Sequence, residues 1–280
     1  MIHNSTQLKA IVRNKANGDS NKSLVIIRKF VMERFLERLS VSKYKNMFII
    51  KGGMLVSSIV GIENRATMDI DTTIRGFDLN EETIKRIITE ITDIPIDDGL
   101  SFKITKVSNI MDDFDYPGIR ASMVAFLDTM KIPFKLDVST NDVITPKEIE
   151  YDYPLSFEDR SISVLSYNLE TIFAEKLETI IRRGVANTRM RDFYDVAIMT
   201  SGIYRKPDYV VLRNALIATA EQRGSTPLLE RRTEIMNQIM TDSGIQGYWS
   251  EYQNSYDYAA VYGFEDVIKA VNELFSKINM

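Results

Sequence analysis

The sequence predicts an α+β fold, with a mixed sheet and helices in the N-terminal part and helices alone in the C-terminal part. Up to residue 160, segments in which apolar and polar residues alternate, as in strands, are interspersed with segments of helical periodicity. Beyond that point only the helical spacing of apolar residues is found, and several of these segments end at a glycine. The change of period predicts two domains, residues 1–160 and 161–280.

The individual elements follow from their apolar spacing and their ends. Residues 22–39 have the apolar positions of an amphipathic helix, and residues 80–91 form a second one that begins after the N-cap Asn80. A short segment at 46–51 leads into two glycines and a helix at 54–60. Strands are expected at residues 65–74, 101–107, 119–128 and 132–139, and the C-terminal helices at 167–184, 190–200, 208–224, 228–240 and 264–278.

Composition restricts the chemistry that this protein can perform. The sequence has no cysteine, which excludes disulfides, thiolate metal sites and cysteine nucleophiles. Its one histidine is His3, so zinc sites and serine–histidine catalysis are disfavoured. Its formal net charge of −4 argues against a globally basic nucleic-acid binder but permits a local basic patch. No apolar run reaches the roughly 20 residues of a membrane helix, and the N-terminus lacks a signal-peptide segment. A cytoplasmic protein that uses carboxylates, lysines and a hard cation is therefore expected.

Three aspartates on two predicted strands are the first candidates for such chemistry. In RATMDIDTTI, residues 65–74, the strand period of two puts Asp69 and Asp71 on the same face. In IPFKLDVST, Asp137 likewise lies opposite the apolar face. If the two strands are neighbours, the three carboxylates converge, and Mg²⁺ prefers oxygen ligands of this kind. A solvated surface D-x-D pair without a metal is the competing interpretation.

Two glycines strengthen the functional interpretation. Gly52 and Gly53 follow Lys51 and precede a short helix, where backbone amides without neighbouring side chains can meet a phosphate. A phosphate-binding turn followed by a D-x-D strand is a combination suited to phosphoryl transfer.

The order of these motifs resembles the nucleotidyltransferase superfamily of the polymerase β type. More closely, the sequence resembles the AbiEii toxin family of bacterial abortive-infection and toxin–antitoxin systems. Four stretches carry the resemblance in the family's order across residues 48–199: FIIKGGMLVSSIVGIENRATMDIDTTI, FKLDVS, ETIFAEKLETIIRR and RMRDFYDVAIM. Thr67 stands where the family usually has serine, and the last 80 residues carry no assignable motif.

The resemblance implies an N-terminal nucleotidyltransferase domain and a helical domain that completes the active-site cleft. It implies a Mg²⁺-dependent enzyme (with Mn²⁺ as a possible substitute) that transfers a nucleoside monophosphate from an NTP to an acceptor hydroxyl. The expected acceptor is tRNA, and the expected outcome is growth arrest, neutralised by an AbiEi-type antitoxin, in phage defence. The residues assigned are Asp69 and Asp71 as metal ligands, Asp137, Lys176 and Asp192 as further catalytic groups, and Gly52, Gly53, Ser57, Lys176 and Arg189 as NTP contacts.

Lys176 is also notable without the resemblance, because it interrupts the apolar stripe of its helix four residues from both Ile172 and Ile180. It either extends past the stripe to solvent or is an ammonium held by packing for a phosphate. On the next predicted helix, Asp192 and Asp195 share one face, and Asp195 is expected to orient a neighbour such as Arg189 or Lys176.

The segment from Lys176 to Arg191 has five basic residues and one acid, Glu178, so its local charge is 5 − 1 = +4. This charge suits a triphosphate or an RNA backbone, whereas salt bridges within the protein are the alternative. Two rival functions remain open at this stage. One is a nucleotidyltransferase that acts on a protein or small molecule, and the other is a non-catalytic nucleotide-binding module.

Overall fold

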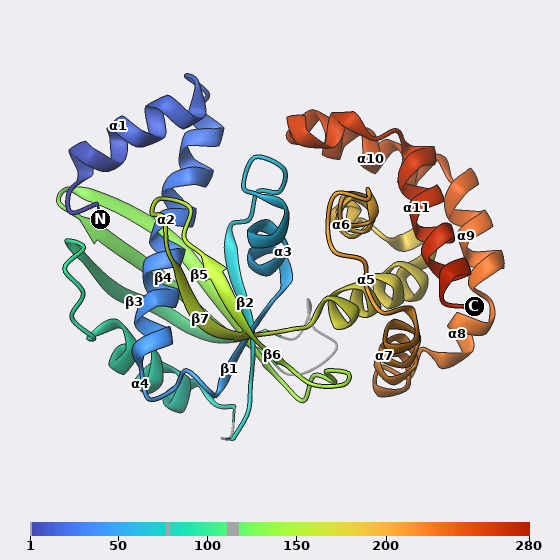
Figure 1. Cartoon of the computed structure of the whole chain (residues 1–280), viewed down its shortest axis with the longest axis horizontal. Coiled ribbons are helices and arrows are strands. Elements are labelled where there is room, and N and C mark those ends of the chain that lie inside the picture. The colour runs from blue at the N-terminus through green and yellow to red at the C-terminus, as the bar shows by residue number, and fades with distance from the viewer. Residues whose placement is uncertain (1, 77–78, 111–117) are drawn as a thin grey trace. The chain divides into compact units, whose positions relative to one another are not determined.

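A computed structural model describes residues 2–76, 79–110 and 118–280 of the chain (Figure 1). The chain forms two compact units. The first comprises Met1–Asp142 and Ile149–Ser166, and the second comprises Val143–Glu148 and Tyr167–Met280. The first unit combines a sheet with helices and the second has helices only, which confirms the predicted α+β class.

The first unit is built on a mixed sheet of seven strands in the order β3-β4-β5-β2-β1-β7-β6. Two neighbouring pairs, β2 with β5 and β1 with β7, are parallel, and the other pairs are antiparallel. The strands are β1 (Phe48–Lys51), β2 (Asp69–Ile74), β3 (Leu100–Ile110), β4 (Gly118–Leu127), β5 (Met130–Thr140), β6 (Ile149–Pro154) and β7 (Ser161–Ser166).

One face of this sheet is buried under a long helix. The first unit contains α1 (Ser5–Ala16), α2 (Ser20–Val41), α3 (Gly52–Val60) and α4 (Glu81–Thr92), and Asn80 caps α4 as predicted. Phe35 of α2 packs against Phe102 of β3 and Phe134 of β5. Ile70 of β2 and Leu136 of β5 lie opposite each other and are fully buried on the same side. By strand alternation, the acidic positions of β2 and β5 face away from α2.

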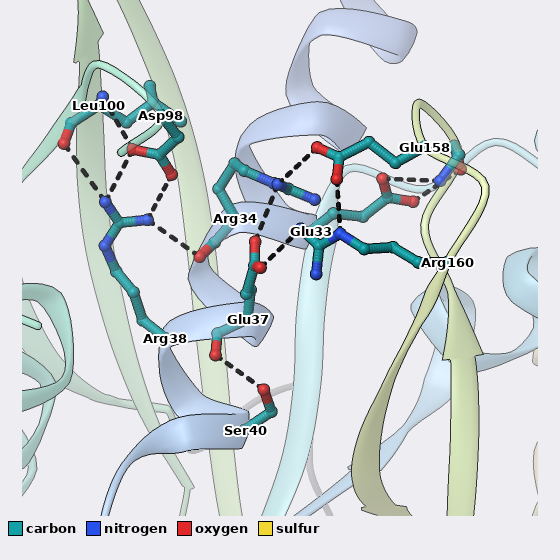
Figure 2. A network of polar contacts seen from close by, with 10 residues as sticks. Glu33, Arg34, Glu37, Arg38, Ser40, Asp98, Leu100, Glu158 and Arg160 are labelled. Carbon is teal, nitrogen blue, oxygen red and sulfur yellow. Dashed lines mark hydrogen bonds and ion pairs between the residues drawn. The ribbon is translucent and has the colours of Figure 1, made fainter. Parts of the chain in front are cut away.

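Helix α2 also carries a buried network of charged side chains (Figure 2). Arg38 donates two hydrogen bonds, of 2.7 and 2.9 Å, to the carboxylate of Asp98 just before β3. Arg34 pairs with Glu158, and Glu33 accepts hydrogen bonds from the backbone and hydroxyl of Ser156 in the β6–β7 turn. These bonds attach two loops to α2. Because the loops flank opposite parts of the sheet, α2 is fixed across its apolar face.

The second unit consists of helices that follow the predicted pattern with some differences. Its long helices match the predicted ranges, but the helix expected at 228–240 is interrupted at Arg231 and forms two. No helix in the described part of the chain is long and apolar enough to cross a membrane. The helices are α5 (Leu169–Arg183), η1 (Gly184–Ala186), α6 (Met190–Thr200), α7 (Tyr209–Gln222), α8 (Thr226–Glu230), α9 (Arg232–Thr241), α10 (Ser243–Ser255), η2 (Asp257–Val261) and α11 (Phe264–Lys277).

Several elements lack a clear signal in the sequence. Helix α10 contains Gly244 and Gly247, and glycine in a helix costs roughly 1 kcal/mol relative to alanine. Strand β6 contains Pro154 and lies at an edge of the sheet, where proline is tolerated. Residues 155–160, at the end of the predicted first domain, form the turn between β6 and β7.

Candidate active site

The predicted acids of the first unit lie on neighbouring strands. Strands β2 and β5 pair in parallel, and their register puts Asp71 directly opposite Asp137 and Asp69 opposite Lys135. Residues directly opposite each other on paired strands point to the same face of a sheet. The three carboxylates therefore share the face of the sheet that α2 does not cover.

Two basic residues extend this row at its ends. Lys51 of β1 lies opposite Asp71, and Arg120 of β4 lies opposite Asp137. The Arg120 guanidinium donates to both oxygens of Asp137, from Nε to Oδ1 at 2.8 Å and from Nη2 to Oδ2 at 2.7 Å. Lys51 Nζ instead pairs with Asp142 Oδ2 at 2.6 Å. We call these four residues the acid row. Across four neighbouring strands they follow the order Lys51, Asp71, Asp137 and Arg120, with the two acids in the middle and one basic residue at each end.

The glycine pair packs directly against the acid row. A Cβ at Gly52 would lie 2.1 Å from Asp71 Oδ2, and the residue has a φ of +64°. A Cβ at Gly53 would lie 2.7 Å from the Thr67 hydroxyl oxygen. The Gly53 N–H donates to Asp71 Oδ2 at 3.3 Å. Only glycine fits here, and the first amides of α3 therefore lie beside the carboxylate of Asp71.

Mutual repulsion and burial both act on the acids. Burial raises the pKa of Asp69, and the negative charges of Asp71 and Asp137 raise it further. Burial also raises the pKa of Asp137, although the hydrogen bond from Arg120 opposes this shift. Both carboxylates are thus less stable when ionised than exposed aspartates, and a nearby cation would favour their charged forms.

A divalent cation fits the donor set of Asp69 and Asp71. Mg²⁺ is commonly held by one or two carboxylates together with waters and substrate phosphates. Among the residues that the structure describes, no three acidic or histidine side chains converge into a complete metal cage. The fit is therefore to a cation whose remaining ligands are waters or oxygens of a phosphate substrate.

Ser57, expected to contact phosphate, lies elsewhere. Its side chain is fully buried within α3, and its hydroxyl oxygen accepts a hydrogen bond of 2.9 Å from Lys29 of α2. The hydroxyl thus binds a buried lysine inside the first unit, and we do not include it among the candidate phosphate contacts.

The predicted residues of the second unit form their own cluster. Lys176 of α5 is buried, and its Nζ contacts Asp192 Oδ1 at 3.1 Å and Asp195 Oδ2 at 2.5 Å on α6. Arg189, which precedes α6, reaches Asp192 Oδ2 with Nε at 3.2 Å. The interpretation in which Lys176 extends to solvent is wrong, because two carboxylates hold its ammonium inside the unit. Asp195 orients Lys176, as predicted.

The charge balance around Asp192 favours its ionised form. Burial alone would raise the pKa of Asp192, but the positive charges of Lys176, Arg189 and Arg191 outweigh burial and lower the pKa to about 2. The cluster therefore has a fixed ionic arrangement at neutral pH, which holds the lysine ammonium in one place.

The structure reveals site residues that the sequence analysis did not identify. Arg120 is a single charged residue in the otherwise apolar or small stretch 118–127, and that isolation was a usable signal. Asp142 follows the end of β5 and belongs to no pattern, so only the fold brings it to Lys51. Arg182, counted in the basic segment, pairs with the fully buried Glu178 of its own helix at 2.9 Å.

Sequence comparison places the chain in a family. The profile described as nucleotidyl transferase AbiEii toxin, type IV toxin–antitoxin system, matches residues 34–270. This chain belongs to the AbiEii family. The match spans both units, and it confirms the resemblance seen in the motifs. A search of curated proteins found no match.

Solved structures provide matches to the fold. The chain is similar to MenT4, a nucleotidyltransferase toxin from Mycobacterium tuberculosis H37Rv, with 15% identity and a TM-score of 0.58 over 97% of this chain and 98% of that one. It is also similar to JHP933 from Helicobacter pylori, with 14% identity and a TM-score of 0.48 over 91% of this chain and 93% of that one. The family match identifies an AbiEii-type nucleotidyltransferase toxin, and the likeness to MenT4 supports the fold.

The glycine turn offers a test of the site in the first unit. We expect Gly52→Ala to lower nucleotidyl transfer by roughly 100-fold, because the new methyl group must displace the Asp71 carboxylate and small displacements at a reacting centre are that costly. The control is Gly18→Ala, which has a similar φ of +87° but no atom within 4 Å of the added Cβ. Equal activity of the two variants would show that the contact with Asp71 does not matter.

The low pKa of Asp192 predicts a pH-dependent stability of the second unit. A carboxyl group with a folded-state pKa below its unfolded value stabilises the fold above pH 4, and the stabilisation is lost as pH falls from 4 towards 2. We expect Asp192→Asn to destabilise the unit by about 2 kcal/mol at pH 7 and by progressively less below pH 4.

Fluorescence of Trp249 reports this transition selectively, because it is the only tryptophan of the sequence and is buried in the second unit. The control is Glu221→Gln, an exposed acid on α7. A stability difference for Asp192→Asn that stays constant between pH 7 and pH 3 would contradict the ionic account.

Proposed function

We propose that this AbiEii-family toxin transfers a nucleoside monophosphate from an NTP to a hydroxyl of tRNA and thereby arrests growth. The observation that carries the proposal is the contact between the glycine turn and Asp71, in register with Asp137. A phosphate-binding turn beside paired carboxylates suits the positioning and charge stabilisation on which phosphoryl transfer depends.

Each residue of the first unit then has a role. Asp69 and Asp71 hold Mg²⁺, or Mn²⁺ in its place, and a bound cation would neutralise charge on the phosphates during transfer. The amides after Gly52 contact the triphosphate at the start of α3. Asp137 accepts a hydrogen bond from the acceptor hydroxyl. The hydroxyl oxygen forms a bond to the α-phosphorus, the bond to the β-phosphate oxygen breaks, and pyrophosphate leaves while the hydroxyl proton passes to Asp137 or to water.

The second unit holds the two cations that the family resemblance assigns to the NTP. Asp192 and Asp195 fix the ammonium of Lys176 in one place. Arg189 is partly exposed and provides a second phosphate contact. Asp192 keeps both cations in place and is a positioning acid in this account.

The choice of tRNA as acceptor is supported by the basic segment 176–191, with a restriction imposed by the structure. Lys176, Arg182 and Arg189 each pair with an acid of their own unit, whereas Arg191 is exposed. Arg191 is therefore the strongest candidate for a phosphate contact with an RNA backbone. An AbiEi-type antitoxin is the partner expected to neutralise the toxin, and the proposal does not require direct contact between them.

A transfer assay tests the proposal. The protein is incubated with Mg²⁺, each of the four α-labelled triphosphates, total tRNA and a cell lysate, and the products are separated by size. We expect label on RNA of tRNA size with one preferred triphosphate, and we expect Asp71→Asn to reduce it to background because a metal ligand is lost.

The matched control for Asp71→Asn is Asp152→Asn, which removes an exposed aspartate from β6 of the same sheet and should leave transfer unchanged. Label on a protein would show that the acceptor is a protein and not tRNA. Absence of label on every acceptor would refute the proposal that the protein is a transferase.

A further inference from the structure

Arg120 occupies one end of the acid row and has no role in the reaction as described so far. Its guanidinium forms two short hydrogen bonds with Asp137, one to each carboxylate oxygen. Paired contacts of this kind are among the strongest that a carboxylate makes in proteins. The Arg120 side chain is 25% exposed, whereas that of Asp137 is 4% exposed. The guanidinium thus covers Asp137 and keeps part of its own surface towards solvent.

The contact changes what Asp137 can bind. With a guanidinium on both oxygens, the carboxylate is already neutralised, and a divalent cation at the same oxygens would lie a few ångströms from a fixed positive charge. Like charges at that separation repel, which disfavours a divalent cation at the oxygens of Asp137. Asp69 and Asp71 have no comparable partner among the hydrogen bonds and ion pairs found for the described residues, apart from the Gly53 amide on Asp71.

A second arginine–aspartate pair in the described part of the first unit provides a contrast. Arg38 and Asp98 are both almost fully buried and attach a loop to α2, which is a structural task. Arg120 lies on the opposite face of the sheet, in register with the acids, and is partly open to solvent. Its position in the row of carboxylates, and not its exposure, distinguishes Arg120 from Arg38.

We propose that Arg120 supplies the fixed positive charge that a second metal ion would otherwise provide, so that the site takes one divalent cation, at Asp69 and Asp71. The inference rests on the proposed function and deepens it. Two-metal sites clamp the attacking and leaving oxygens between two cations. Here the Arg120 guanidinium stands on the Asp137 side, where the acceptor hydroxyl is expected, and each oxygen of Asp137 keeps a lone pair for that hydroxyl.

Counting bound Mn²⁺ tests this inference without an activity assay. The loss of the free Mn²⁺ signal in electron paramagnetic resonance gives the number of ions and their affinity for the full chain, with no nucleotide present. We expect one ion for the wild type and none for Asp69→Asn/Asp71→Asn. We expect Arg120→Met to bind a second ion, and Arg120→Met/Asp137→Asn to bind one again.

Because Arg120→Met leaves a buried carboxylate without its partner, a second variant secures the test if this one does not fold. Arg120→Met/Asp137→Asn removes the pair as a whole, so that it leaves no unpaired charge and keeps the net charge of the site. If Asp137 is no metal ligand, this double variant binds Mn²⁺ with an affinity within about threefold of the wild type. If Asp137 is a ligand, its loss weakens binding by roughly tenfold or more.

The outcomes separate the two proposals. Two ions on the wild type, a tenfold loss of affinity in Arg120→Met/Asp137→Asn, or a single ion on folded Arg120→Met would each overturn the role of Arg120 and leave the proposed transferase intact. A wild type that binds no Mn²⁺ would remove the metal site of the proposed function, and the inference about Arg120 with it.

Discussion

The parallel pairing of β2 with β5 is the constraint on which the candidate active site depends. It sets Asp71 against Asp137, and the antiparallel neighbours β1 and β4 add Lys51 and Arg120 at the two ends. A shift of this register by one residue would send one set of side chains to the face under α2. The apolar residues Ile70 and Leu136, fully buried on that face, therefore hold the acids in their positions.

The molecule uses buried charge for two different purposes. In the network of α2, pairs such as Arg38 with Asp98 connect loops to a helix, and both partners are neutralised inside the first unit (Figure 2). In the second unit, Asp192 and Asp195 hold Lys176 between two helices, so that an ammonium is fixed and not mobile. The first arrangement attaches loops to a helix, and the second fixes one ammonium between two carboxylates, so that three charges are buried together.

The sequence predicted the parts of the protein whose pattern is local. The period of two in residues 65–74 identified the face shared by Asp69 and Asp71, and the apolar stripe around Lys176 identified a lysine in an unusual place. It did not predict the pairing of Asp137 with Arg120 or of Lys51 with Asp142, because each joins residues that are distant along the chain and come together only through the sheet. Ser57 shows the converse: its position after the glycines suggested a phosphate contact, but the packing of α3 on α2 turns its hydroxyl to Lys29.

We propose that Asp69 and Asp71 of the first unit bind a cation together with the triphosphate. A crystal structure of the protein with Mn²⁺ and a non-hydrolysable NTP analogue, analysed by the anomalous scattering of manganese, tests it most directly. We predict an anomalous peak within coordination distance of Asp69, Asp71 and a phosphate oxygen, with Asp137 still paired to Arg120. An analogue bound away from the glycine turn, or a manganese peak remote from both aspartates, would contradict this account.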